Sequence, residues 1–247
     1  MEQTWQIMGM PITLTLPGAT AKAADFAAVY DYFVAVDAQY STYKADSEIS
    51  QINDGLPGSK WSQEMKLILQ LCEQTTTETN GYFDIRRQGK LDPSGLVKGW
   101  AIQQAAELLR RRGRHDFSID AGGDVQLDGL NVAQKPWRIG IRNPFKRDEI
   151  VKVVALTGSG IATSGLYIRG HHIYNPLAPD TALTEVASLT VIGPNVYEAD
   201  RFATAAFAMG RAGIQFIDSR DGLEGYMIDS EGVATLTTGF ERFMVAS

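Results

Sequence analysis

The chain has 247 residues, of which 44% are hydrophobic and 21% charged, values typical of a folded globular protein rather than a disordered or fibrous one. Its 23 basic and 29 acidic residues give a formal net charge of -6, which argues against a nucleic-acid partner or an anionic membrane surface. The single cysteine, Cys72, excludes a disulfide framework and a thiolate metal site. Because Cys72 lies in the apolar helical run MKLILQLCEQ, we interpret it as a packing residue.

The beginning of the chain carries no recognisable targeting signal. The stretch MEQTWQIMGMPITLTLPG has no basic region followed by a long apolar one and no lipidation cysteine. No segment approaches the ~20 consecutive apolar residues of a membrane-spanning helix. We therefore expect a protein with no membrane span, located in the cytoplasm.

The first half of the chain is predicted to be mainly helical. A strand is expected in WQIMGMPITLTL, where apolar and polar residues alternate toward the end. An amphipathic helix is expected over residues 22–39, followed by a turn and a short helix in STYKADSEISQIN. Two longer helices follow in SQEMKLILQLCEQTTTETNG, ended by Gly81, and in SGLVKGWAIQQAAELLRRRG, ended by Gly113.

The second half is predicted to be rich in strands. FSIDAGGDVQLDG, WRIGIRNP, EIVKVVALTGSGIATSG and VASLTVIG combine β-branched residues with glycine punctuation. Helices are expected in YEADRFATAAFAMG and over residues 211–219, before a closing pair of strands in EGYMIDSEGVATLTTG. Because several strands follow one another directly, the order of elements favours an α+β fold with mostly antiparallel sheets flanked by helices.

Two glycine-containing clusters at predicted element ends are candidate binding sites. In DPSGLVKG a helix start and Lys98 offer positive charge to an anion such as a phosphate, although an ordinary helix start with a solvated lysine reads the same way. In IDAGGDVQLDG, Gly122 and Gly123 allow either a close approach to a ligand or a tight hairpin turn. No helix follows the glycine pair, so a Rossmann site is excluded.

Two further clusters carry groups suited to catalysis or metal binding. ATSGLYIRGHHIYNP contains two of the three histidines, and histidine is the side chain best suited to accept a proton near neutral pH. Asp200 and Thr204 are one helical turn apart, with Asn195 as the predicted N-cap. Their hard oxygens suit Mg²⁺, whereas the alternative is that Thr204 bonds the Asp200 carbonyl and Asp200 pairs with Arg201 or another base.

Taken in chain order, these clusters resemble the ApbE-type FAD:protein FMN transferases, also called flavin transferases. The resemblance spans about residues 8 to 210 and rests on the segments MGMPITLTL, YSTYKADSEISQIN, GYFDI, DPSGLVKGWAIQQA, DAGGDVQLDG, IATSGLYIRGHHIYNP and ADRFATAAFAMG. It implies one ApbE-like, T-fold-related domain over residues 1–247. It also implies transfer of the FMN half of FAD, with Mg²⁺, to a Thr or Ser hydroxyl of an acceptor protein through a phosphoester bond, releasing AMP.

The resemblance also implies roles for individual residues. Asp200 and Thr204 match the side-chain ligands of the metal, the backbone oxygen of Val97 matches a main-chain ligand, and His172 matches the proposed general base. The expected flavin contacts are Ser41, Thr42, Tyr43, Ser94, Lys98, Gly122, Gly123, Asp124, Thr163, Ser164 and Gly165. The bound cation would then compensate the carboxylate of Asp200.

Some positions depart from the family pattern, and other activities fit the same site. Leu166 stands where the family often has an acidic or amide residue, and Asn175 stands where it often has an acidic one. PLAPDTA replaces the usual Pro-x-Thr-Gly turn, and these changes affect the expected recognition of the acceptor. The family's usual target is a segment of the type Asp-x-x-Thr/Ser-x-Ala-Thr. Two alternatives are a Mg²⁺-dependent FAD pyrophosphatase, which gives FMN and AMP, and a non-catalytic flavin-binding protein.

Overall fold

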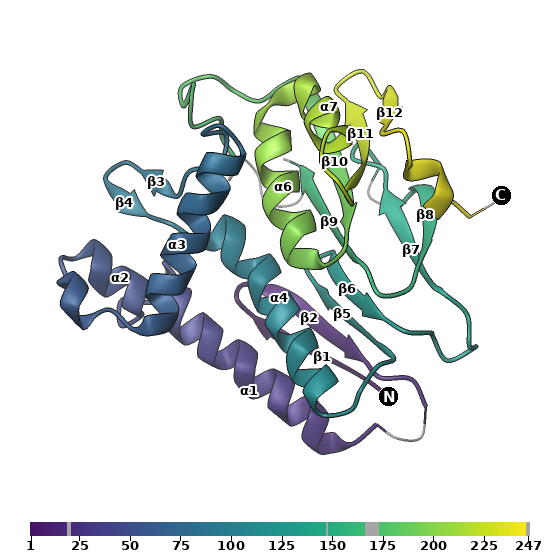
Figure 1. The fold of residues 1–247 in the computed structure, drawn as a ribbon, viewed down its shortest axis with the longest axis horizontal. Coiled ribbons are helices and arrows are strands. Elements are labelled where there is room, and N and C mark those ends of the chain that lie inside the picture. The colour runs from purple at the N-terminus through teal and green to yellow at the C-terminus, as the bar shows by residue number, and fades with distance from the viewer. Residues whose placement is uncertain (19–20, 147, 166–172, 246–247) are drawn as a thin grey trace.

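An eight-stranded antiparallel sheet forms the centre of the structure, a computed structural model that describes residues 1–18, 21–146, 148–165 and 173–245 (Figure 1). The strands follow the order β1-β2-β5-β6-β9-β10-β11-β12, and each neighbouring pair is antiparallel. Their bounds are β1 (Glu2–Ile7), β2 (Met10–Thr15), β5 (Phe117–Ala121), β6 (Asp124–Asp128), β9 (Gly160–Gly165), β10 (Val186–Gly193), β11 (Glu224–Asp229) and β12 (Ala234–Leu236). The predicted α+β class with antiparallel pairing is confirmed.

The first predicted strand is a hairpin of two strands, β1 and β2. Met8 and Gly9 connect them with φ angles of 56° and 71°. Two consecutive left-handed residues form the tight turn that matches the twist of paired strands, and glycine adopts this conformation without steric cost. The single strand predicted over WQIMGMPITLTL is therefore wrong, because the alternation of apolar residues breaks at this turn.

Helices cover one face of the sheet. In Figure 1, α1 (Ala23–Tyr40), α4 (Ser94–Arg111) and α6 (Val196–Ala208) lie across the strands, and α3 (Gln63–Glu78) packs beside them. The shorter α2 (Glu48–Asn53) and α7 (Gly213–Asp218) complete this layer. Each of these helices was predicted to within a few residues, and Asn195 caps α6 as expected by accepting a hydrogen bond of 2.9 Å from the Glu198 amide.

Two small hairpins complete the fold. The hairpin of β7 (Trp137–Arg142) and β8 (Ile150–Leu156) covers part of the opposite face, where Ile141 and Val154 share a core with Val125 and Leu127 of β6. The hairpin of β3 (Arg86–Arg87) and β4 (Lys90–Leu91) lies beside α3 in Figure 1. Cys72 is buried in the helical core, which confirms its predicted packing role.

Glycines allow α6 to lie very close to its neighbours. A Cβ atom on Gly99 of α4 would lie 2.7 Å from Cβ of Asp200, and one on Gly160 of β9 would overlap the backbone nitrogen of Val196. Such separations are shorter than any ordinary carbon contact, so a larger side chain would push the helix away. The two glycines therefore fix the position of Asp200 relative to α4 and the sheet.

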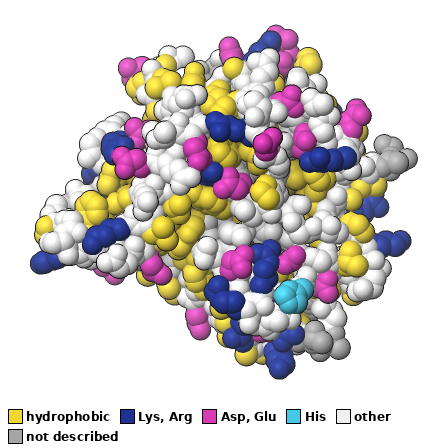
Figure 2. Space-filling model, in the orientation of Figure 1, with side chains coloured by type: hydrophobic (Ala, Val, Ile, Leu, Met, Phe, Trp, Pro, Cys, Tyr) yellow, Lys and Arg dark blue, Asp and Glu magenta, His cyan; other side chains and the backbone are white. Residues whose placement is uncertain are grey.

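The surface carries charges of both signs. Basic and acidic side chains are interspersed over the face seen in Figure 2, consistent with the modest net charge of -6. None of the helices in the part of the chain that the structure describes combines the length and apolar character needed to cross a bilayer.

Candidate active site

A cavity of about 640 Å³ lies where the start of α4, the middle of α6 and strand β9 meet. Most of the site residues predicted from the sequence line it, although they come from distant parts of the chain. They are Ser41, Thr42, Tyr43, Ser94, Val97, Lys98, Thr163, Ser164, Asp200 and Thr204. The cavity therefore unites the STY segment, the DPSGLVKG helix start, the end of β9 and the Asp200/Thr204 pair.

Other predicted site residues lie away from the lining or outside the described part of the chain. Gly122 and Gly123, with φ angles of 64° and 100°, form the two-residue turn between β5 and β6, so the hairpin alternative describes their structure. Gly165 ends β9 outside the lining. Flavin contacts by these glycines stay predictions. His172, Leu166 and the first histidine of the HHIYNP segment lie outside the described residues.

Asp200 is 3% exposed, and polar groups of α4 contact both of its carboxylate oxygens. Its Oδ2 accepts a hydrogen bond of 2.9 Å from the Gly99 amide, and its Oδ1 lies 3.2 Å from Nζ of Lys98. Burial raises the pKa of Asp200 above its ordinary value, Lys98 opposes this rise, and the negative charge of Asp124 adds to it. The carboxylate is thus compensated in this structure by Lys98 and an amide, and Arg201 does not contact it.

Lys98 connects two acidic residues from different elements. Its ammonium contacts the carboxylate of Asp124 as well as that of Asp200. Asp124, which is 2% exposed, also accepts a hydrogen bond of 3.0 Å from the Thr163 amide through Oδ1. Asp124 is not part of the cavity lining. It lies behind Lys98 and orients it, and a direct flavin contact by its carboxylate stays a prediction.

The cavity offers several hard oxygens suited to a small divalent cation. Asp200 and Thr204, from one face of α6, and Val97, from the first turns of α4, all line it. Among the described residues, no three His, Cys, Asp or Glu side chains gather into a metal site, and the Asp200 carboxylate is the charged ligand that this set offers. Mg²⁺ accepts such a set because it keeps several waters or substrate oxygens. Among the described residues, the Thr204 hydroxyl forms no hydrogen bond to the Asp200 carbonyl, so this part of the sequence alternative is wrong.

The first turn of α4 is open toward the cavity. Ser94 and Gly95 line it, and Oδ1 of Asp92 accepts a hydrogen bond of 3.0 Å from the Ser94 amide. The Leu96 and Val97 amides donate to the Pro93 carbonyl, which leaves, within the described residues, the Gly95 amide and the helix dipole for an anionic group. Gly95 leaves little space beyond itself: a Cβ there would lie 3.3 Å from the Phe83 ring and 3.7 Å from Cγ2 of Thr204. Phe83 and Thr204 therefore form the wall beside the helix start.

An exposed aromatic ring borders the same cavity. Tyr43 is 98% exposed, yet it lines the cavity together with Ser41 and Thr42. An aromatic side chain in this position provides a face for a planar ring system. The Tyr43 side chain packs against almost nothing in the protein, so a contact with a ligand, as predicted, would give this aromatic ring a role.

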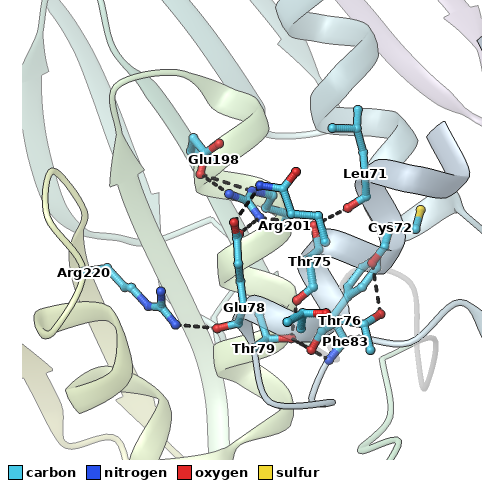
Figure 3. Close-up of polar contacts among 12 residues, drawn as sticks. Leu71, Cys72, Thr75, Thr76, Glu78, Thr79, Phe83, Glu198, Arg201 and Arg220 are labelled. Atoms are coloured by element: carbon cyan, nitrogen blue, oxygen red, sulfur yellow. Dashed lines mark hydrogen bonds and ion pairs between the residues drawn. The ribbon is translucent and has the colours of Figure 1, made fainter. Parts of the chain in front are cut away.

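A polar network behind the cavity joins α6 to the end of α3 (Figure 3). The buried Arg201 guanidinium contacts the Glu78 carboxylate and donates hydrogen bonds of 2.7 Å to Glu198 and 3.2 Å to Thr75. Arg220 donates to the Glu78 carbonyl. Because Arg201 follows Asp200 directly, these contacts hold the α6 segment that carries the candidate metal ligands.

The same network extends to the GYFDI segment on the cavity wall. Thr79 accepts a hydrogen bond of 3.2 Å from the Phe83 amide through its hydroxyl, which itself donates 2.7 Å to the Thr75 carbonyl. Phe83 lines the cavity beside Thr204. The network thus fixes both the wall and the helix that carries Asp200.

Some lining residues were not predicted as site residues. They are mainly Met8, Gly9 and Met10 of the first hairpin turn, Asp37 and Tyr40 of α1, Tyr82 to Ile85, Arg87, and Tyr174. In the sequence, GYFDI and MGMPITLTL carry only the family resemblance, and Arg87 is the second residue after GYFDI. For GYFDI, the position after a predicted helix end was the available signal, because loops at element ends commonly carry binding groups.

The fold and the cavity define an α+β protein with one buried carboxylate, a hydroxyl and an open helix start at the same site. The chain belongs to the ApbE family, whose family model matches residues 8–89 and 85–227. This finding agrees with the resemblance inferred from the sequence.

Individual relatives and solved structures support the assignment. FAD:protein FMN transferase of Salmonella typhimurium is 30% identical over 168 residues, covering 63% of this chain and 48% of that protein. The enzyme of the same name from Klebsiella pneumoniae is 31% identical over 163 residues, covering 62% of this chain and 45% of that protein. The chain thus spans about half the length of the curated relatives it matches.

The solved structures match over nearly the whole chain. The flavin transferase ApbE of Vibrio cholerae superposes with a TM-score of 0.86 and 21% identity, covering 98% of both chains. The ApbE protein of Thermotoga maritima gives a TM-score of 0.88 and 20% identity, covering 100% of this chain and 99% of that one. At this identity the likeness establishes the fold.

Proposed function

We propose that this protein is a Mg²⁺-dependent FAD:protein FMN transferase, which attaches FMN to a Thr or Ser hydroxyl of an acceptor protein and releases AMP. Family membership supports the reaction class, because the relatives that match carry this name. The single observation that carries the proposal is the meeting of Asp200, Thr204 and Val97 with the open start of α4 in one cavity. That arrangement suits a cation and a diphosphate together.

The residues present fit a Mg²⁺ ion. Asp200, Thr204 and the carbonyl oxygen of Val97 would hold it, and the buried carboxylate gains most from a nearby cation because burial disfavours its charged form. When bound, Mg²⁺ supplies positive charge to the diphosphate and withdraws electron density from the attacked phosphorus. Lys98, held by Asp124, keeps the Asp200 side chain directed toward α4.

The remaining residues of the site would bind and orient the two reactants. The Gly95 amide at the start of α4 and the Ser94 hydroxyl are suited to phosphate oxygens, and Tyr43 is suited to stack on a planar ring. In the transfer step the acceptor hydroxyl oxygen forms a bond to the FMN phosphorus. The bond from that phosphorus to the bridging oxygen breaks, and AMP leaves with the electron pair.

His172 is the proposed acceptor of the hydroxyl proton. Although His172 lies outside the described residues, Ile173 and Tyr174, which follow it directly, line the cavity. Imidazole is suited to this task because its ordinary pKa lies near neutral pH. Water in place of the acceptor hydroxyl would give FMN and AMP from the same site.

One incubation tests the proposal against its alternatives. The protein is mixed with FAD, Mg²⁺ and an acceptor that contains an Asp-x-x-Thr/Ser-x-Ala-Thr segment, and AMP release is followed together with flavin fluorescence of the acceptor in a denaturing gel. Covalent fluorescence with AMP is expected. AMP without labelled acceptor would identify a pyrophosphatase, and neither product would leave a flavin-binding protein. His172→Ala should retain FAD binding and lose transfer, and Asp200→Ala should lose turnover.

A further inference from the structure

The β3–β4 hairpin is held rigidly beside the cavity. Its turn residues Gln88 and Gly89 have φ angles of 51° and 77°, the two-residue geometry that fixes strand register. The side-chain amide of Asn53, from the end of α2, donates a hydrogen bond of 2.9 Å to the Leu91 carbonyl and accepts one of 2.8 Å from the Leu91 amide. Arg87, the last residue before the turn, thus has a defined backbone position.

Arg87 lies on an aromatic ring that is itself anchored. Its guanidinium carbon is 4.6 Å from the centre of the Tyr174 ring, and both residues line the cavity. The Tyr174 hydroxyl donates to the carbonyl oxygens of Asp84, at 3.0 Å, and of Arg86, at 3.3 Å. A guanidinium stacked on a ring face keeps its N–H edge available and loses less freedom when it binds a ligand.

Arg87 differs from the other described basic residues of the cavity lining in its ion pairing. Among the described residues, three basic and four acidic ones line the cavity, namely Lys44, Arg87 and Lys98 against Asp37, Asp84, Asp92 and Asp200. Lys44 lies 2.6 Å from Asp37, and Lys98 contacts Asp124 and Asp200. Arg87 forms no ion pair with any carboxylate in the described ranges. Among the lining residues that the structure describes, Arg87 is therefore the cation without a carboxylate partner that an entering anionic ligand would meet.

The chain places Arg87 near the candidate metal ligands. Phe83 lies on the wall beside Thr204, and Arg87 is only four positions further along the chain. Four residues span at most about 14 Å even when fully extended. A ligand with two phosphates between a flavin half and an adenosine half can therefore approach both the Asp200/Thr204 pair and Arg87.

We infer that Arg87, supported by the Tyr174 ring, binds a phosphate group of the dinucleotide and so distinguishes phosphorylated flavins from riboflavin. The inference rests on the proposed function, because it takes FAD as the ligand of the cavity. Guanidinium groups match phosphate oxygens with paired N–H donors, and such charge-assisted bonds are stronger than neutral ones. Arg87 thereby adds a phosphate contact that does not depend on the metal.

The neighbouring arginine provides a matched control. Arg86→Ala removes the same side chain and the same charge, but Arg86 is not part of the lining and faces Asp84 at 3.5 Å. Dissociation constants for FAD and for riboflavin would be measured by flavin fluorescence with wild type, Arg87→Ala, Arg87→Lys and Arg86→Ala, each with Mg²⁺ and with EDTA. Melting temperatures of all four proteins would confirm that each variant is folded.

Arg87→Ala should weaken FAD binding by about 10- to 100-fold, with and without Mg²⁺, and leave riboflavin binding within about twofold. Arg87→Lys should recover part of the loss, and Arg86→Ala should stay near wild type. Tyr174→Leu should weaken FAD binding when Arg87 is present and have a much smaller effect in the Arg87→Ala background, because the ring acts through the guanidinium.

Two outcomes would overturn the inference. Equal FAD affinities for Arg87→Ala and Arg86→Ala would mean that only overall charge matters. Equal losses for FAD and riboflavin would mean that Arg87 contacts the flavin ring or shapes the cavity. If wild type bound neither flavin, the proposed function itself would fail, a result distinct from failure of the Arg87 contact.

Discussion

The ammonium of Lys98 lies 3.2 Å from Oδ1 of Asp200 and also contacts the carboxylate of Asp124, so that one cation lies between two buried acids. The three residues come from α4, α6 and β6, and each of the two acids is at most 3% exposed. Charges removed from water are tolerated only when they are paired and hydrogen-bonded. Lys98 is therefore central to the electrostatics of the cavity.

Replacing Lys98 by Met should destabilise the protein in a pH-dependent way. With EDTA present at pH 8, the free energy of unfolding is expected to fall by about 3–5 kcal/mol, because two buried carboxylates then lack their cation. Burial already raises the pKa of Asp200 and Lys98 holds it down, so the variant raises it further. When a carboxyl group has a higher pKa in the folded state than in the unfolded state, the protein becomes less stable as pH rises from the unfolded pKa to the folded pKa. Urea unfolding at pH 5 and pH 8 should show the smaller loss at pH 5, and an equal or larger loss there would contradict this.

Magnesium should stabilise the wild-type protein through Asp200. At a Mg²⁺ concentration of 100 times its dissociation constant, binding to the native state alone adds about 2.7 kcal/mol, or a rise in Tm of about 5–10 °C. Asp200→Asn removes the charged ligand and should abolish this rise, while Thr204→Val should reduce it. Differential scanning fluorimetry with MgCl₂, compared with KCl at equal ionic strength, gives the measurement. A full Mg²⁺ shift in Asp200→Asn would remove that residue from the metal site.

Substitution of Gly99 by Ala should separate α4 from α6. The added Cβ would lie 2.7 Å from Cβ of Asp200 and 3.0 Å from the Val196 carbonyl oxygen, so a cost of about 1–3 kcal/mol is expected. The matched control is Gly58→Ala, where the new Cβ would meet only the Trp61 ring at 3.9 Å. Denaturant unfolding measures both variants, and equal stabilities would show that the helices move apart without cost. A weaker Mg²⁺ response in Gly99→Ala alone would link the spacing of the helices to the site.

Arg201→Ala should be much more damaging than Arg211→Ala. The Arg201 side chain is 6% exposed and its loss leaves Glu78 and Glu198 without their shared partner, at an expected cost of about 3–5 kcal/mol. Arg211 is 53% exposed beside Asp229, and its pair is worth at most about 1 kcal/mol. Urea unfolding at pH 7 compares the two variants, and similar losses would disprove the structural role of the Figure 3 network.

The ion pair between Arg201 and Glu78 predicts how the destabilisation caused by Arg201→Ala varies with pH. Burial acts to raise the pKa of Glu78, but hydrogen bonds from Gln74 and Arg201 hold it below its ordinary value of 4.5. A lowered folded-state pKa gives stability that is present above the ordinary value and is lost as pH falls through the lowered one. The difference between wild type and Arg201→Ala should therefore narrow below pH 4.5, which equilibrium unfolding at stepped pH would reveal.

The sequence was sufficient for the elements with a strong local pattern. The helices α1, α3, α4 and α6 follow from apolar periodicity and from cap residues such as Asn195, and the site segments were found where polar or glycine clusters interrupt that periodicity. The β3–β4 hairpin was not predicted, because strands of two residues leave no period to detect.

Long-range pairing was beyond local patterns. Nothing near Asp200 in the sequence indicated that Lys98 and the Gly99 amide would compensate its charge, since these groups meet only when α4 packs against α6. The same holds for Arg201, which pairs with Glu198 three residues earlier on the same helix but also reaches the distant Glu78. Contacts between residues far apart in the sequence depend on how the helices and strands pack, which local sequence patterns do not show.

The hydrogen bond from the Gly99 amide to Asp200 joins positions 101 residues apart. During synthesis at about 5–20 residues per second, the amide therefore emerges some 5–20 s before its acceptor. A nascent chain cannot complete this contact between α4 and α6 until Asp200 has been synthesised. A product that stops before Asp200 would accordingly lack the contact altogether rather than retain part of it.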